Sequence, residues 1–274
     1  MSTIQNLSKE SLRVVSGNRG LQIRDGLENE YSDIYTPEVI DALKALSVFN
    51  KDQKMLMEKR YARRAQRFRN KERIRFLDSH DFIPRTNIKV QDARDGKFIG
   101  SEIPHDLQRQ WIQGTGPAAK PNSPIESSIR NVAYALLSGA DGWMFDGEDA
   151  LGQISSMSLD NQRNLKLAIK RAPLFMEVAE KIAGVMNKWG KEFFGHEIIK
   201  DWKKQLDFTT IIFRARGLHL DDRHKRDENG LALSASIVDI VLYVVNNYQE
   251  LQKREASLVL YLPKIQTAEE AAFW

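Results

Sequence analysis

The sequence predicts an α/β protein with a parallel β-sheet, and three short apolar runs lead to this prediction. The runs cover residues 143–145, 209–213 and 258–262. Strands that are buried on both faces of a parallel sheet have this unbroken apolar composition. Longer segments with helical spacing separate the runs, as in successive βαβ units. Each run also ends in charged residues, and the carboxyl ends of the strands in a (β/α) barrel are where catalytic groups lie.

The composition excludes several classes of protein. The chain has 274 residues, 42% of them apolar and 28% charged, which is ordinary for a globular protein of one large domain or a large and a small one. It contains no cysteine, which excludes disulfides, thiolate nucleophiles and cysteine-based zinc sites. No apolar run reaches the roughly 18 residues of a membrane helix, and residues 1–13 have no apolar signal core. We therefore expect a cytoplasmic protein with no membrane partner.

The N-terminal part of the chain is expected to be mostly helical. Residues 1–35 are polar and punctuated by glycines, which indicates an irregular arm. A helix should begin at Thr36, because a hydroxyl N-cap there is followed by proline and glutamate in the first turn. A second helix is predicted from about residue 52 to 77. We accordingly predict an N-terminal helical region in residues 1–84 and the first part of a barrel in residues 85–274.

The second helix is unusually basic. Nine lysines and arginines lie between residues 59 and 75. They could form a face that binds nucleic acid, or they could be solvated charges whose stems cover apolar surface. The second interpretation is favoured, because the charges are spread around the helix, few aromatic residues accompany them, and the net charge of the chain is only +4. We expect no nucleic-acid partner.

The remaining elements continue the alternation of strands and helices. Proline and glycine break up residues 84–124, within which two segments, 86–93 and 111–114, are predicted to be extended. Apolar residues at helical spacing predict further helices at residues 125–137, 159–172, 175–188, 196–205, 234–251 and 269–274.

Three carboxylates follow the first apolar run. Asp146 and Glu148 share one face of an extended chain, because side chains alternate along a strand, and Asp149 comes next. Two carboxylates on one face can hold Mg²⁺, directly or through water, or they can orient an arginine. Zinc is not indicated, because this cluster lacks histidine.

The next two runs bring cations to the same edge of the sheet. Arg214 is suited to bidentate recognition of a carboxylate or to stabilising a developing oxyanion. Lys264 can act as a point charge, or form a Schiff base if its pKa is lowered. His219 is close to this edge but is expected to be a packed residue. The sequence has no Walker A loop, no Gly-x-Gly-x-x-Gly and no Gly-x-Ser-x-Gly, so ATP, dinucleotide and serine-hydrolase sites lack a motif.

Several blocks of the sequence resemble the malate synthase family. They lie in the family's order and cover about residues 35–274. The blocks are Gln91–Arg94, Gly100–Leu107 and Gly114–Pro117 at the opening of the barrel domain, Phe145–Asp149 for the Asp-Phe-Glu-Asp motif, Arg214–Leu220 for Arg-x-Arg-Gly-x-His-Leu, and Tyr261–Lys264 with Glu270, Ala271 and Trp274 for Tyr-Leu-Pro-Lys…Glu-Ala…Trp.

The resemblance implies a (β/α)8 TIM-type barrel that condenses acetyl-CoA with glyoxylate and water to malate and CoA, in the glyoxylate cycle and with Mg²⁺. It implies that Arg214 is the catalytic arginine, which contacts glyoxylate and stabilises the enolate. Asp146 and Glu148 match acidic positions that orient this arginine and the metal. Contacts to substrate or CoA are implied for Arg109, Gly116, Asp149 and Lys264.

Some positions depart from the family pattern. Gly147 replaces the aromatic residue of the acidic motif, and Ala150 replaces the small hydroxyl residue that follows it. Only Arg109 represents an arginine pair of the first block, with Trp111 in the second place, and the loop there carries extra residues, 119–124. A related acyl-CoA lyase that uses another 2-oxo acid is therefore an alternative.

The chain ends at Trp274, before the family's two metal ligands and its proton-abstracting aspartate. We expect it to hold about the first four βα units, to contain no metal ligand, and to be inactive alone as an incomplete part of the enzyme. A half barrel exposes a sheet edge, so the missing half is expected as a continuation or as a second chain. A non-catalytic half barrel that binds a partner is the other alternative.

Overall fold

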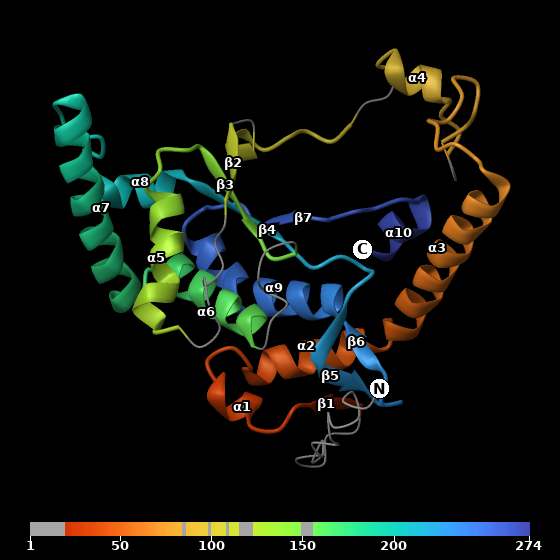
Figure 1. The fold of residues 1–274 in the computed structure, drawn as a ribbon, viewed down its shortest axis with the longest axis horizontal. Coiled ribbons are helices and arrows are strands. Elements are labelled where there is room, and N and C mark those ends of the chain that lie inside the picture. The colour runs from red at the N-terminus through yellow and green to blue at the C-terminus, as the bar shows by residue number, and fades with distance from the viewer. Residues whose placement is uncertain (1–19, 84–85, 98–99, 108–109, 115–122, 149–155) are drawn as a thin grey trace, which may run out of the picture.

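A computed structural model of the chain describes residues 20–83, 86–97, 100–107, 110–114, 123–148 and 156–274. Its central feature is a four-stranded parallel sheet (Figure 1). In sheet order, the strands are β2 (Trp111–Gly114), β3 (Gly142–Asp146), β4 (Thr210–Arg214) and β7 (Val259–Tyr261). The three apolar runs and the predicted extended segment at 111–114 are confirmed as strands, and so is the α/β class with a parallel sheet.

The register of the sheet brings the ends of the strands together. Asp146 at the end of β3 is the Cα partner of Arg214 at the end of β4. Arg214 is in turn the partner of Tyr261 at the end of β7. Because the strands run in one direction, the residues that follow them emerge at one edge, which we call the carboxyl edge.

Six described helices link or follow these strands: α5 (Ile125–Leu136), α6 (Met157–Ile169), α7 (Pro173–Phe194), α8 (Trp202–Phe208), α9 (Ala235–Lys253) and α10 (Ala268–Phe273). The prediction of a helix at 196–205 is wrong in its position. Helix α7 continues to Phe194 and ends where Gly195 adopts a φ of 76°. Helix α8 begins only after Asp201, whose side chain accepts a hydrogen bond from the N–H of Lys204 and caps it.

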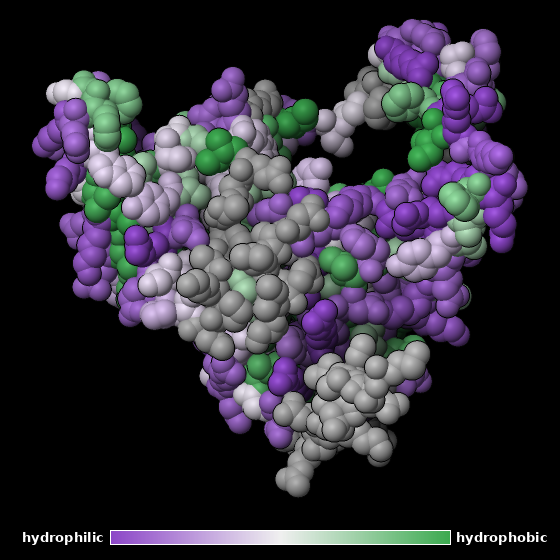
Figure 2. Space-filling view, in the orientation of Figure 1, coloured by the Kyte–Doolittle hydropathy of each residue, from purple (hydrophilic) through white to green (hydrophobic). Residues whose placement is uncertain are grey.

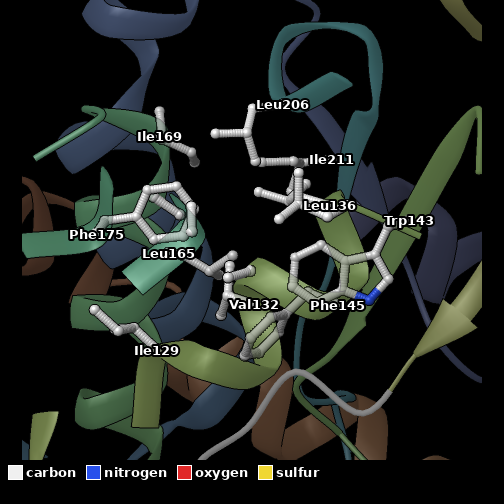
Figure 3. Close-up of a cluster of buried hydrophobic side chains, with 14 of the residues drawn as sticks. Ile129, Val132, Leu136, Trp143, Phe145, Leu165, Ile169, Phe175, Leu206 and Ile211 are labelled. Atoms are coloured by element: carbon white, nitrogen blue, oxygen red, sulfur yellow. The ribbon is translucent and has the colours of Figure 1, made fainter. Parts of the chain in front are cut away.

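The main apolar core lies between the sheet and helices α5, α6 and α7 (Figure 3). Trp143 and Phe145 of β3 are fully buried, with their rings edge to face and 5.5 Å apart. Phe213 of β4 stacks on Tyr243 of α9, with 4.6 Å between the ring centroids. Burial of a side chain such as phenylalanine contributes about 1.5–3 kcal/mol. This core therefore holds the two strands whose ends carry the charged residues.

The N-terminal region contributes two longer helices, α2 (Pro37–Ser47) and α3 (Asn50–Asn70). Helix α2 begins as predicted, because Oγ1 of Thr36 accepts a hydrogen bond from the N–H of Val39. Helix α3 ends before the predicted residue, where Lys71 adopts a left-handed φ of 54°. Apolar residues of α2 share a second core with α9, and the boundary between two domains stays a prediction.

A small antiparallel sheet departs from the sequence prediction. Its strands are β1 (Leu21–Ile23), β5 (Asp221–Asp227) and β6 (Ala232–Ser234), with β5 in the middle. Strand β5 reads Asp-Asp-Arg-His-Lys-Arg-Asp and lacks the apolar pattern of a strand. Its buried carboxylates have side-chain partners, because Arg216 donates to Asp222 and Asn50 donates to Asp227. The prediction of an irregular arm is wrong where the chain forms β1 and the short helix α1 (Leu27–Glu30). The first nineteen residues of the predicted arm are outside the described part.

Two short helices occupy the segment rich in proline and glycine, α4 (Val90–Arg94) and η1 (His105–Leu107). The extended structure predicted for 86–93 is wrong over α4, because the N–H of Ala93 donates to the carbonyl of Lys89 and closes a helical turn. Figure 1 shows α4 beyond the far end of α3, away from the sheet. Within the described part of the chain, no helix combines the length and the apolar character needed to cross a membrane.

Candidate active site

Arg214 lies between two carboxylates at the carboxyl edge. Its Nη1 donates to Oδ2 of Asp146 over 2.9 Å, and its Nη2 donates to Oε2 of Glu148 over 2.5 Å. All three residues are buried, Glu148 most deeply with 2% of its surface exposed. Hydrogen bonds between a guanidinium and carboxylates are strong and directional. The plane of the Arg214 side chain is therefore held in one orientation.

Gly147 permits the close approach of the acidic turn to β4. Its N–H donates to the carbonyl oxygen of Arg214 over 3.0 Å. A Cβ atom at position 147 would lie 2.7 Å from that oxygen, which is closer than packed atoms come. Oδ1 of Asp146 also accepts from the N–H of Glu148 over 3.0 Å. The turn thus presents both carboxylates to the same guanidinium.

Glu148 faces two more groups that can carry positive charge. Nζ of Lys264 lies 3.4 Å from its Oε1, and Nε2 of His219 lies 3.9 Å from the same oxygen. Gly217 borders this oxygen, and a Cβ there would lie 2.6 Å from it. Glu148 is consequently the common partner of side chains that follow β4 and β7.

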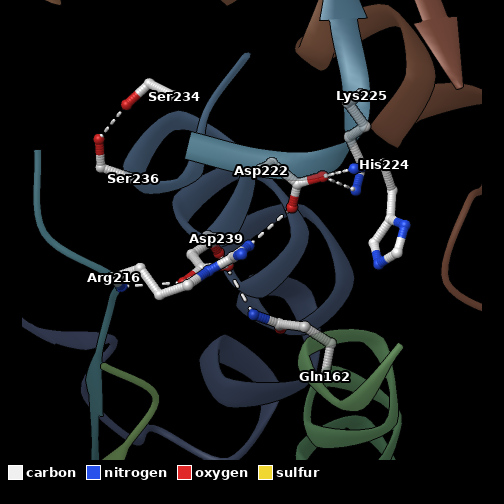
Figure 4. A network of polar contacts seen from close by, with 8 residues as sticks. All are labelled: Gln162, Arg216, Asp222, His224, Lys225, Ser234, Ser236 and Asp239. Carbon is white, nitrogen blue, oxygen red and sulfur yellow. Dashed lines mark hydrogen bonds and ion pairs between the residues drawn. The ribbon is translucent and has the colours of Figure 1, made fainter. Parts of the chain in front are cut away.

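A second buried charge network follows Arg214 in the chain (Figure 4). Arg216 donates to both carboxylate oxygens of Asp239 in α9, at 2.7 and 2.9 Å, and to Oδ2 of Asp222 at 2.8 Å. Nζ of Lys225 lies 3.4 Å from Oδ1 of Asp222. Two cations and two carboxylates thus balance each other where little water reaches them.

The pKa values in this network depend on the neighbouring charges. Burial lowers the pKa of Arg216, but Asp239 and Asp222 outweigh burial and hold that pKa above its ordinary value. Burial raises the pKa of Asp222, but Lys225 and Arg216 outweigh it and hold that pKa below its ordinary value. Both shifts favour the charged forms of Arg216 and Asp222, and the network anchors the segment that follows β4.

Helix α3 connects the segments that follow β4 and β7. The side-chain amide of Gln53 donates to the carbonyl of Leu218, and Nη2 of Arg60 donates to the carbonyl of Lys264. Lys264 has a φ of 54°, in the left-handed region that residues other than glycine rarely adopt. The bond from Arg60 therefore stabilises the backbone conformation in which Nζ of Lys264 approaches Glu148.

Four site residues predicted from the sequence lie together at the carboxyl edge: Asp146, Glu148, Arg214 and Lys264. Three further predicted residues lie outside the described part of the chain: Arg109, Gly116 and Asp149. The roles of all seven stay predictions.

The sequence prediction overlooked three residues that contact the predicted site residues or Arg216, namely Tyr261, Arg60 and Asp239. The ring centroid of Tyr261 lies 5.7 Å from Cζ of Arg214, a distance typical of a cation–π contact. Asp239 could have been found, because it is the single charged residue in the otherwise apolar first half of its helix. Arg60 carries no such signal, because it is one of nine lysines and arginines between residues 59 and 75.

The described residues do not fit a Mg²⁺ site. Among them, no three histidine, aspartate or glutamate side chains lie together in a way that could hold a metal ion. The two carboxylates nearest to each other at the carboxyl edge, Asp146 and Glu148, both bond to Arg214. Any Mg²⁺ would need ligands from outside the described part.

Comparison with known proteins finds similarity to malate synthases. Residues 210–274 match the family described as malate synthase, TIM barrel domain, and this stretch contains β4, β7, Arg214 and Lys264. Malate synthase A of Escherichia coli strain K12 is 30% identical over 194 residues, which are 71% of this chain and 30% of that protein. The chain is therefore similar to malate synthases over most of its length.

Other malate synthases match nearly the whole chain. The malate synthase of Dictyostelium discoideum is 27% identical over 260 residues, and that of Myxococcus xanthus is 26% identical over 256 residues. Each of these two matches covers 93% of this chain and 40% of the relative. The chain thus spans between 30% and 40% of the length of these three malate synthases.

Proposed function

We propose that this chain carries the arginine-containing part of a malate synthase active site, for the condensation of acetyl-CoA with glyoxylate in the glyoxylate cycle. The observation that carries this proposal is the position of Arg214 between Asp146 and Glu148 at the carboxyl edge. A guanidinium that is already oriented can stabilise a developing oxyanion without reorganisation during the reaction. The similarity of the chain to malate synthases supports the choice of reaction.

The reaction places negative charge on oxygen twice. A base removes a proton from the methyl group of acetyl-CoA, which leaves an enolate. The enolate carbon then forms a bond to the aldehyde carbon of glyoxylate, and the resulting alkoxide takes up a proton. Water finally cleaves the thioester, which releases malate and CoA. We assign to Arg214 the binding of glyoxylate and the stabilisation of the enolate oxygen.

We assign orienting roles to the two carboxylates. A proton on either carboxylate oxygen that faces Arg214 would remove an acceptor that holds its guanidinium. Asp146 and Glu148 therefore serve better as fixed acceptors than as the base that removes the methyl proton. Contacts to substrate or CoA are proposed for Lys264 and for three residues outside the described part, Arg109, Gly116 and Asp149.

We further propose that the four parallel strands are the first four units of a (β/α)8 barrel. The sheet order β2–β3–β4–β7 supports this, because each strand lies beside the next parallel strand along the chain. In the described sheet, β2 and β7 each have one paired neighbour, so further strands can add at either side. A continuation or a second chain would supply them, and we expect this chain to be inactive without them.

The test is release of CoA from acetyl-CoA in the presence of glyoxylate and Mg²⁺. We would compare this chain alone with the Dictyostelium enzyme in which this chain replaces the matching region. The chain alone should show no turnover, and the chimera should be active. In the chimera, Arg214→Ala should lower turnover by roughly 10²–10³, the usual effect of losing one oxyanion donor. The control is Arg223→Ala, because Arg223 is exposed on β5.

Three results would contradict the proposal. One is robust turnover by the chain alone, and another is unchanged turnover in the Arg214→Ala chimera. The third is a chimera that prefers pyruvate to glyoxylate, which would favour a related lyase for another 2-oxo acid.

A further inference from the structure

Residues 59–77 form a strongly basic surface, which we call the basic arm. It comprises the second half of α3 and the segment that follows the helix. It holds nine lysines and arginines and one acid, Glu72, so its net charge is 9 − 1 = +8. Since the whole chain has a net charge of +4, the rest of it has 4 − 8 = −4. The positive charge of this chain is therefore concentrated on the basic arm.

Little of this charge is balanced within the described residues. Arg60 and Arg63 lie 3.7 and 3.5 Å from the carboxylate of Glu270 in α10. These are the ion pairs of the basic arm in the part that the structure describes. Of the other basic side chains, Arg67 is half-buried and the rest are exposed, so they can attract carboxylates or phosphates of a partner.

The basic arm also exposes large apolar side chains. The exposed fractions are 86% for Phe68, 81% for Ile74 and 92% for Phe76, and about half of Tyr61 and Leu77 is exposed as well. Figure 2 shows hydrophobic residues among hydrophilic ones over this side of the molecule. Exposed apolar groups gathered in this way mark interaction sites, whereas single ones are ordinary.

The backbone groups of the segment after α3 have no backbone partner among the described residues. Residues 73–77 belong to no helix, strand or turn, and their sequence alternates arginine with apolar residues as Arg-Ile-Arg-Phe-Leu. None of their N–H or C=O groups bonds to another backbone group of the described residues. A segment of this kind can pair with a strand of another polypeptide, whose backbone groups provide affinity.

We propose that the basic arm binds an acidic polypeptide segment in extended conformation. The partner strand pairs with residues 73–77, its carboxylates meet the arginines, and its apolar side chains cover Ile74 and Phe76. Nucleic acid and anionic lipid would satisfy the positive charge but not the unpaired backbone groups. An acidic and apolar strand matches all three features of the basic arm.

The test uses the 274-residue chain and a labelled probe peptide in which glutamate alternates with leucine. Fluorescence anisotropy should show saturable binding. Arg73→Glu with Arg75→Glu should weaken binding about tenfold or more, and so should Ile74→Ser with Phe76→Ser; tenfold corresponds to about 1.4 kcal/mol. These side chains are exposed, so the variants should fold normally. The amides of residues 73–77 should exchange hydrogen more slowly in the complex, as paired strands do.

Matched control variants lie on helices far along the chain from the arm. Lys203→Glu with Lys204→Glu changes two exposed charges on α8, and Phe193→Ser removes a phenylalanine that is 73% exposed on α7. Neither should change the affinity for the probe. Single-stranded polyuridylate and phosphatidylserine vesicles serve as competing ligands.

Several results would overturn the proposal. The first is an affinity for the peptide that responds to the charge variant alone, without protection of the amides. The second is tighter binding of polyuridylate or of the vesicles than of the peptide. The third is sedimentation of the unlabelled chain as a dimer that Arg73→Glu with Arg75→Glu dissociates, since the basic arm would then join two copies of this chain.

Discussion

The carboxylate of Asp239 holds both the backbone and the side chain of Arg216. Its Oδ2 accepts from the backbone N–H at 2.8 Å and from Nε at 2.9 Å, and its Oδ1 accepts from Nη2 at 2.7 Å. Arg216 follows Arg214 by two residues. Helix α9 therefore anchors the chain directly after the residue to which we assign catalysis.

Replacing Asp239 by asparagine should lower the free energy of unfolding by about 3–5 kcal/mol, because a buried charge would lose its main partner. Chemical denaturation followed by circular dichroism measures the change. Asp207→Asn is the matched control, because the side chain of Asp207 is 64% exposed where it pairs with Arg171. That change should cost less than about 1 kcal/mol. Equal losses in the two variants would contradict the importance of the buried network.

The contribution of Asp222 to the stability of the fold should decrease at acid pH. Lys225 and Arg216 hold its pKa in the folded chain below the ordinary value against the opposing effect of burial. A carboxylate with a lowered folded pKa stabilises the fold above its unfolded pKa, which is about 3.9, and loses this effect as the pH falls through the folded value. The difference in unfolding free energy between wild type and Asp222→Asn should therefore be constant above about pH 5 and shrink below about pH 4. A difference that does not change with acid would contradict the lowered pKa.

Lys225 should show the opposite dependence at alkaline pH. Burial lowers its pKa, but Asp222 and Tyr35 outweigh burial and raise the pKa above the ordinary value. Its contribution is then complete below an unfolded pKa of about 10.4 and is lost as the pH rises through the folded value. Unfolding curves of wild type and Lys225→Met should differ most below about pH 10 and converge above it. A difference between the two variants that grows as the pH rises would contradict a raised pKa of Lys225.

Gly147→Ala should destabilise the chain by about 1–3 kcal/mol, the usual cost of forcing an extra carbon into packed structure. The new Cβ would lie 2.7 Å from the carbonyl oxygen of Arg214, which the sheet holds in place. Gly184→Ala in α7 is the control, because nothing lies within 4 Å of the added Cβ. That variant should gain about 0.5–1 kcal/mol from helix formation. Thermal unfolding measures the stability of both variants. An unchanged stability of Gly147→Ala would contradict the close approach of the acidic turn to β4.

Arg60 and Glu270 should be energetically coupled across α3 and α10. Both side chains are buried, and their charged ends lie 3.7 Å apart. A double-mutant cycle with Arg60→Met and Glu270→Gln should give a coupling energy within the range of about 0.5–3 kcal/mol for contacting residues. The exposed pair Lys253 and Glu250 on α9 is the control and should couple by no more than about 0.5 kcal/mol. Independent effects in the first cycle would show that α3 does not hold the Lys264 segment.

Local patterns in the sequence suffice to predict the parallel sheet. The runs at 143–145 and 209–213 consist of apolar residues and threonine, because both faces of β3 and β4 are covered. The same logic places Arg214 beside Asp146, because neighbouring parallel strands end at one edge. These inferences need only the pattern of apolar residues along each strand and the common direction of the strands.

Elements that depend on distant partners could not be predicted in this way. Strand β5 reads as a solvated charged segment, but Arg216 neutralises Asp222, and Asp239, which lies 23 positions from Arg216, holds that arginine. The contact between Arg60 and the carbonyl of Lys264 joins residues 204 positions apart, and no local pattern marks either of them. The sequence alone therefore does not show which of its charged residues are buried.

The pairing of Asp146 with Arg214 in the sheet also determines where this chain tolerates changes of length. These residues lie 68 positions apart, yet their juxtaposition comes from the register of β3 and β4. The connection between them contains α6, α7 and α8, so a reporter sequence inserted between α7 and α8 should leave the ion pair intact. A slip of β4 by one residue would instead turn Arg214 to the opposite face of the sheet. Engineering of this molecule can therefore vary the length of the loop between α7 and α8, while the two strands must keep their alignment.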